Sequence, residues 1–213
     1  HWFMGPTFFA VERENQGQVE VFSVQYECPM FRNPPPCTRN GQLSLVNMIT
    51  ELVEHRDRNK MLVNLVKKAS SGTRQLLVLS DRRQHCEFLH KCFPTSSGLY
   101  MGGMKEADLE ASSKKKIIFA TFSQAHEGLD IPTLDTVILS TPKSDIQQSI
   151  GRVMRETPGK NNNPHIYDIV DQWSILFAMY KKRLRVYKQG GFRIDAVEDK
   201  EEVNPFQGKC LFL

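Results

Sequence analysis

Cysteine is sparse in this chain of 213 residues, and its spacing argues against two kinds of site. No two of the five cysteines form a C-x-x-C pair, so neither a zinc site nor a disulfide framework is supported. The histidines show no ligand spacing either, and we expect no metal held by this chain alone. The cysteines are Cys28, Cys37, Cys86, Cys92 and Cys210.

Long hydrophobic runs are also missing. No apolar run approaches the ~20 residues of a membrane-spanning helix, and the first residues lack the basic stretch and apolar core of a secretory signal. We therefore expect no membrane partner, and reduced thiols in the cytoplasm or the nucleus. The chain begins with His1 rather than an initiator methionine, so we expect it to be a piece of a longer polypeptide.

The composition is that of an ordinary globular domain. Hydrophobic residues make up 40% of the chain and charged residues 24%. The length fits one domain with appendages. A net charge of +4 permits nucleic acid as a partner without requiring it.

Short apolar runs alternate with helical patterns from residue 75 onward. The run at 76–80 is typical of a strand buried on both faces, and similar runs follow at 99–101, 116–121, 136–140 and 165–170. Two helices, near 45–52 and 61–69, precede them. This alternation predicts an α/β fold with a parallel sheet flanked by helices.

The two ends of the chain suggest appendages to this unit. Two β-rich runs within residues 7–26, separated by a turn-like segment, predict an N-terminal β-hairpin, and a proline-rich loop follows. We expect residues 1–42 to be this hairpin and linker, residues 43–190 the main lobe, and residues 191–213 a tail that could add one strand. The last helix, near 173–187, has a basic side with Lys181, Arg183 and Lys188. That side is either a solvated face or a nucleic-acid contact.

The segment from Gln148 to Arg155 places two arginines on one face of a helix. Ser144 and Asp145 offer an N-cap, and at ~100° per residue Gln148, Arg152 and Arg155 lie together on the helix that follows. Apolar residues repeat at the same spacing on roughly the opposite face. Paired guanidinium groups on such a helix suit recognition of a polyphosphate, although a solvated basic face would have the same spacing.

Polar residues also follow three of the predicted strands. Ser80, Asp81 and Arg82 come after the first strand, Thr121 ends another, and Lys143 follows a third. Ligands of open parallel sheets bind beyond the carboxyl ends of the strands. We therefore expect these three segments to meet at one edge of the sheet.

The string Q-x-x-G-R-x-x-R resembles motif VI of superfamily 2 helicases, which lies in the second of their two RecA-like lobes. The resemblance implies that Arg152 and Arg155 reach across a cleft to the γ-phosphate of ATP, with Gln148 as a polar neighbour. Arginine fingers of this kind contribute on the order of 10³–10⁵ to the rate of phosphoryl transfer.

The segment from residue 120 to 132 resembles motif V of the same family. By that match Thr121 contacts the nucleic-acid backbone, Gly128 forms a left-handed turn, and Asp130 accepts from the nucleotide ribose or from an arginine of motif VI. Glu127 stands where DEAD-box proteins have an arginine, which favours the translocase-like branches.

Two further segments resemble nucleic-acid contacts of the family. Ser80 and Arg82 fall in a segment like motif IV, near the strand-binding edge. Gly102 and Gly103 resemble the following glycine turn, which lets a sugar-phosphate backbone approach, although an ordinary turn explains them equally well. Lys143 could add a phosphate contact.

The resemblance implies a RecA-like second lobe of an ATP-dependent helicase, most similar to helicases of large nucleocytoplasmic DNA viruses, the poxvirus transcript-release helicase among them. The chain has neither the G-x-x-x-x-G-K-[ST] phosphate loop nor a D-E-x-[DH] box. ATP and Mg²⁺ would therefore be bound mainly by a first RecA-like lobe, and the chain alone would be inactive. The implied partners are that lobe and nucleic acid, with DNA favoured over RNA; a virion or viral factory joins the expected locations.

Two other functions remain open at this stage. The chain could be a stand-alone nucleic-acid-binding module that has the shape of a motor lobe and no ATPase role. It could also be a transferase lobe, because doubly wound folds host many chemistries. A nucleotide-sugar site would need its own acidic and phosphate-binding residues, which the sequence does not show.

Overall fold

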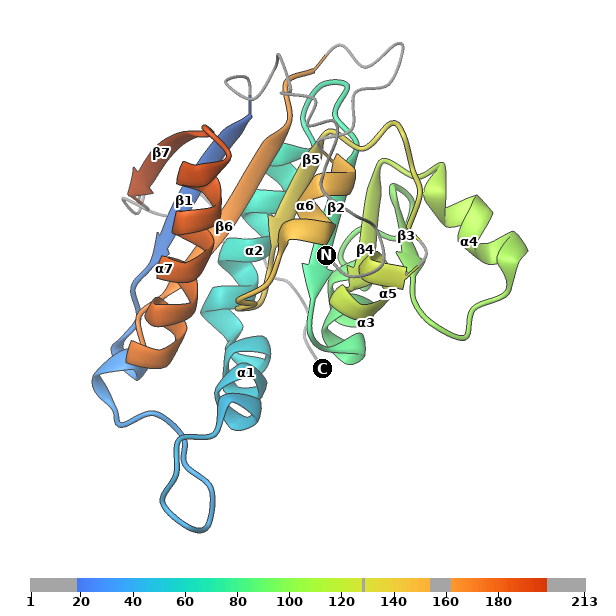
Figure 1. The fold of residues 1–213 in the computed structure, drawn as a ribbon. Coiled ribbons are helices and arrows are strands. Elements are labelled where there is room, and N and C mark those ends of the chain that lie inside the picture. Colours follow the sequence, from blue (N-terminus) through green and yellow to red (C-terminus); the bar gives the residue numbers. More distant parts are fainter. Residues whose placement is uncertain (1–18, 128, 154–161, 199–213) are drawn as a thin grey trace, which may run out of the picture.

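The computed structural model describes residues 19–127, 129–153 and 162–198. Its strands form one seven-stranded sheet in the order β3-β4-β2-β5-β6-β1-β7, and every neighbouring pair is parallel. Figure 1 shows helices on both faces of this twisted sheet. The predicted parallel sheet flanked by helices is therefore confirmed. The strands are β1 (Glu20–Tyr26), β2 (Leu76–Ser80), β3 (Ser97–Tyr100), β4 (Ile117–Thr121), β5 (Thr136–Leu139), β6 (His165–Asp171) and β7 (Arg193–Glu198).

The helices connect these strands in chain order. A 3-10 turn, η2 (Pro29–Arg32), follows β1, and α1 to α3 surround β2 in the sequence. Within the described ranges, no helix is both long enough and apolar enough to span a membrane. The α-helices are α1 (Leu45–Glu54), α2 (Arg56–Ala69), α3 (Arg83–Lys91), α4 (Glu106–Ser113), α5 (Phe122–Glu127), α6 (Gln147–Val153) and α7 (Ser174–Gln189).

Strand β2 shows why the apolar runs form the middle of the sheet. All five of its residues are buried. Successive side chains of a strand point to opposite faces, so Leu77 and Leu79 enter a core with residues of α5, α6 and α7, whereas Leu76 and Val78 enter a core with α2 and α3. A strand that packs against helices on both sides has no polar face, and this produces the continuous apolar run in the sequence.

The prediction of an N-terminal β-hairpin appendage is wrong for its second strand. Strand β1 lies inside the sheet, parallel to β6 on one side and to β7 on the other. Its Val21 packs into one core and Val24 into the other, so it is covered on both faces. Both of its hydrogen-bonding edges are occupied, which leaves no edge for an antiparallel partner. The expected first strand of the hairpin lies outside the described residues.

The same pairing changes the expected domain boundaries. The sheet includes β1, which was assigned to the appendage of residues 1–42, and β7, which was assigned to the tail of residues 191–213. The strand expected near residue 192 is present as β7, at the edge of the sheet. The lobe therefore begins before residue 43 and continues beyond residue 190.

Candidate functional site

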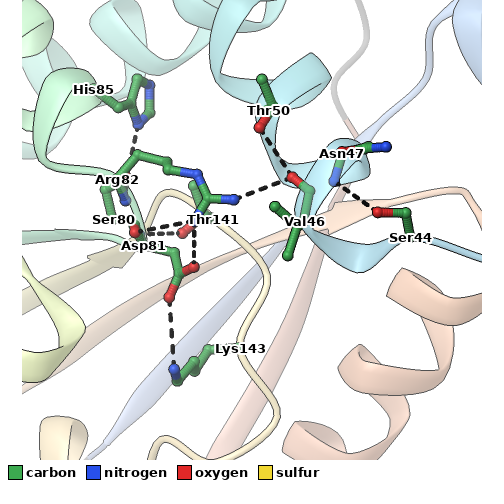
Figure 2. A network of polar contacts seen from close by, with 10 residues as sticks. All are labelled: Ser44, Val46, Asn47, Thr50, Ser80, Asp81, Arg82, His85, Thr141 and Lys143. Carbon is green, nitrogen blue, oxygen red and sulfur yellow. Dashed lines mark hydrogen bonds and ion pairs between the residues drawn. The ribbon is translucent and has the colours of Figure 1, made fainter. Parts of the chain in front are cut away.

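The segments that directly follow the carboxyl ends of the strands are called their exits here. The exits of β2 and β5 contact each other. The Asp81 backbone N–H, just after β2, donates to the Thr141 hydroxyl, just after β5, at 2.8 Å. The Asp81 carboxylate lies 3.6 Å from Lys143 Nζ and 3.0 Å from the Arg82 guanidinium (Figure 2). Two predicted phosphate-contact residues, Arg82 and Lys143, are thus held by one carboxylate at the expected edge.

The exit of β4 lies beside the exits of β2 and β5. Thr121, Phe122 and Ser123 line a hollow of about 130 Å³ together with Asp81 and Lys143. The Thr121 hydroxyl lies 3.1 Å from the Ser123 hydroxyl, and Lys143 Nζ lies 5.5 Å from the centre of the Phe122 ring. Hydroxyl groups and an ammonium at one small polar hollow can donate to a phosphate oxygen. The predicted convergence of Thr121 with Lys143 is confirmed as geometry.

Arg82 also links this edge to the first helix. Its guanidinium donates to the Val46 carbonyl of α1 at 3.1 Å, and its side chain is 29% exposed. The arginine is therefore oriented by two elements while part of it still faces solvent.

Ser80, by contrast, is not positioned to contact a nucleic-acid strand. It is 1% exposed, its hydroxyl lies 3.0 Å from His85 Nδ1, and it accepts from the Arg82 backbone N–H at 3.1 Å. The other ring nitrogen of His85 lies 3.0 Å from the Asn59 amide oxygen, which can only accept. His85 therefore donates to Asn59 and accepts from Ser80. The structure corrects Ser80 from a direct contact to a buried residue that shapes the turn carrying Arg82.

This buried histidine leads to a prediction about acid stability. Burial, together with the nearby Arg58 charge, lowers the pKa of His85 to about 3. Since an exposed histidine titrates near 6.5, the unfolded chain takes up a proton between about pH 6.5 and 3 that the folded chain refuses. Stability present above pH 6.5 is then lost as the pH falls towards 3. Between pH 7 and 5 we expect His85 to account for a loss of about 2 kcal/mol in the free energy of unfolding, measured by urea titration.

The control for this prediction is a histidine elsewhere on the same helix. His85→Gln should remove most of the loss between pH 7 and 5, whereas His90→Gln should retain it. The same pH dependence in His85→Gln and in the unchanged chain would contradict the assignment.

Helix α6 begins directly after the β5 exit, as predicted. The Asp145 carboxylate accepts from the Gln147 backbone N–H at 3.4 Å, and Ile146 and Ile150 are buried in the core. At ~100° per residue, positions 148 and 152 lie on the opposite, outer face of this helix. The side chains of Gln148 and Arg152 lie outside the described residues, and so do Gly128 and Arg155 as a whole.

The remaining predicted site residues lie along the neighbouring loops. Gly103 has a φ of 80°, and the Gly102 carbonyl accepts from the Arg83 guanidinium at 3.1 Å, so the pair forms a turn after β3. Asp130 is exposed, but it lines a different hollow, beside Tyr100 and α4. The structure therefore does not place Asp130 at the hollow of Thr121 and Lys143.

A buried ion pair behind the site was missed by the sequence analysis. Arg183 of α7 is 1% exposed and holds Asp168 of β6 with two nitrogens, at 2.8 and 2.9 Å. Its third nitrogen donates to the Lys143 carbonyl at 2.7 Å, and Tyr187 donates to Asp168 at 2.8 Å. The expectation that Arg183 belongs to a solvated or nucleic-acid-binding face is wrong. Its spacing from Tyr180 and Tyr187 on the apolar face of α7 was the available signal.

Comparisons with known proteins agree with this fold. The family model described as the helicase conserved C-terminal domain matches residues 57–157. A protein of Acanthamoeba polyphaga mimivirus, named "Putative ATP-dependent RNA helicase L396", is 32% identical over 198 residues, which are 89% of this chain and 38% of that protein. The transcript termination protein A18 of myxoma virus is 31% identical over 120 residues, which are 50% of this chain and 25% of that protein.

A solved structure shows the same fold at lower sequence similarity. The crystal structure of T4 UvsW matches 86% of this chain and 42% of its own, with a TM-score of 0.65 and 16% identity. The chain spans less than half the length of the viral relatives and of this structure. Residues 57–157 therefore match the helicase conserved C-terminal domain, and the chain is similar to helicases of large DNA viruses and shares the RecA-like fold of helicase C-terminal lobes.

Proposed function

We propose that the chain is the second motor lobe of an ATP-dependent helicase or translocase that grips the nucleic-acid backbone. The observation that carries this proposal is the meeting of the β2, β4 and β5 exits, with Asp81, Thr121 and Lys143 around one hollow and α6 starting from the third exit. A contact to phosphate at this edge fixes the position of a strand without reading its bases. We favour DNA as the strand and keep RNA as the alternative.

The ATP would lie between this lobe and a first RecA-like lobe. That lobe would supply the phosphate loop and the Mg²⁺ ligands, and this chain would supply Arg152 and Arg155 to the γ-phosphate. Gln148, Gly128 and Asp130 complete our proposal for the cleft. Closing of the lobes on ATP and opening after hydrolysis would move the pair along one strand.

The test of this proposal is ATP turnover by the chain alone and by the two-lobe protein. We expect no turnover from the chain alone, and turnover stimulated by single-stranded nucleic acid when both lobes are present. Lys143→Ala should weaken binding of all sequences alike and lower the salt dependence of log affinity by about 0.7 per lost phosphate contact. Anisotropy titrations over a range of salt concentrations measure this slope.

The control variant is Lys68→Ala, which removes an exposed positive charge from the end of α2 just before the start of β2, at the opposite edge of the sheet. It should leave the slope unchanged. Equal slopes for Lys143→Ala and the unchanged protein would remove Lys143 from the interface. Binding without any turnover in the two-lobe protein would favour the alternative, a stand-alone nucleic-acid-binding module.

A further inference from the structure

A short ordered projection, residues 36–44, lies between η2 and α1; we call it the finger. Three backbone hydrogen bonds hold it: Thr38 N–H to the Gln42 carbonyl at 2.7 Å, Gly41 N–H to Thr38 at 3.0 Å, and Ser44 N–H to Pro36 at 2.9 Å. Gly41, with a φ of 76°, makes the turn at the tip. Figure 1 shows this segment projecting beyond the carboxyl ends of the strands. It is therefore a preformed extension of the edge that carries the candidate site.

The base of the finger is attached to the candidate site by hydrogen bonds. The Ser44 hydroxyl accepts from the Asn47 backbone N–H at 3.3 Å and so caps α1. One residue into that helix, the Val46 carbonyl accepts from Arg82, which pairs with Asp81 (Figure 2). The helix that Ser44 caps is therefore fixed by a hydrogen bond to Arg82, in the exit of β2.

The finger and its flanks have an unusual chemistry for a solvated loop. Residues 28–50 contain no aspartate or glutamate, while Arg32 and Arg39 are both exposed. Leu43 is 48% exposed and Val46 64%; they are the exposed large hydrophobic residues of the described ranges. Guanidinium groups suit phosphates, and apolar side chains suit the faces of bases and sugars. A surface with positive charge, no acidic residue and exposed apolar side chains suits a nucleic-acid strand as its partner. A partner protein with a basic surface would suit it less well.

We propose that the finger is a second nucleic-acid contact, which lengthens the strand held by this lobe; this rests on the proposed function of the carboxyl edge. Arg39 contacts a phosphate, and Leu43 and Val46 pack against a base or sugar. From Ser44 to the tip, four residues span at most about 13 Å. At 3.4 Å per nucleotide, that reach corresponds to about four nucleotides.

The experiment compares two single-stranded oligonucleotides on the two-lobe protein. The shorter is the minimum that binds stably, and the longer extends it by about four nucleotides. The unchanged protein should bind the longer one more tightly. The double variant Arg39→Ser with Leu43→Ser should lose about three- to tenfold in affinity for the longer oligonucleotide and nothing for the shorter. Arg39→Lys should keep most of the affinity, and Lys68→Ser should change neither.

The possible outcomes distinguish a failure of the finger proposal from a failure of the proposed function. If the unchanged protein binds both lengths equally, or if the double variant binds the longer oligonucleotide as the unchanged protein does, the finger proposal is wrong and a protein partner is favoured for this surface. An equal loss at both lengths also overturns it, because the finger would then not lengthen the site. No binding of either oligonucleotide by the unchanged protein would overturn the proposed function itself.

Discussion

Arg152→Ala in the two-lobe protein is expected to lower the rate of ATP turnover by a factor on the order of 10³ to 10⁵, and Arg155→Ala by a similar factor. The reason is that each guanidinium stabilises the negative charge that develops on the γ-phosphate in the transition state. A water molecule in its place cannot supply the same positive charge. Affinity for nucleic acid, measured without ATP, should stay within about twofold, since the phosphate contacts that we propose for the strand lie on the exits of β2, β4 and β5.

The matched control for this prediction is another arginine on a neighbouring helix. Arg185 of α7 is exposed, and Arg185→Ala should keep both turnover and binding. If the Arg152 or Arg155 variant kept normal turnover but lost strand binding, the arginine would contact the nucleic acid and not the nucleotide.

The second large effect concerns stability rather than turnover. Arg183→Met should lower the free energy of unfolding by about 3–5 kcal/mol, because it leaves the Asp168 carboxylate buried without its counter-charge. Asp168 is 0% exposed, and Tyr187 would remain its one neutral donor among the contacts described here. Guanidinium chloride unfolding of the chain, followed by circular dichroism, measures the loss.

Two further variants separate the ion pair from general damage to α7. Arg185→Met, on the exposed side of the same helix, should change stability by less than about 0.5 kcal/mol. Adding Asp168→Leu to Arg183→Met should recover much of the loss, because the buried charge is then removed. If the double variant does not recover stability, the loss comes from poor packing of α7 and not from the unpaired charge of Asp168.

The middle strands could be predicted from sequence because of where they lie. Strands β2, β4 and β5 are covered on both faces, so each is an apolar run with a polar residue only at one end. Their polar exits could be predicted as well, because parallel strands bring their carboxyl ends to one edge. The contacts of Asp81 with Thr141 and Lys143 are the result.

Strand β1 shows what the sequence could not reveal. A turn-like segment before it suggested a local hairpin, but β1 pairs with β6, whose His165 lies opposite Glu20 in the register. Nothing in a local pattern encodes a partner so far along the chain. The position of β1 between β6 and β7 depends on the right-handed connections of the whole sheet.

Buried charges were the other failure. An arginine in a basic run is usually solvated. Arg183 faces inward because it pairs with the buried carboxylate of Asp168. Arg58 of α2 forms a second buried ion pair, with Asp171 of β6 at 2.8 Å. The side chain of Ser80 was misjudged for a related reason, since its burial depends on His85 and Asn59.

The role of Arg152 and Arg155 is tested most directly by a structure of the two-lobe protein with a non-hydrolysable ATP analogue. We expect both guanidinium groups to lie about 2.7–2.9 Å from γ-phosphate oxygens, with the nucleotide held by the first lobe. Both groups turned to solvent, or packed within this lobe while the analogue is bound, would contradict this role.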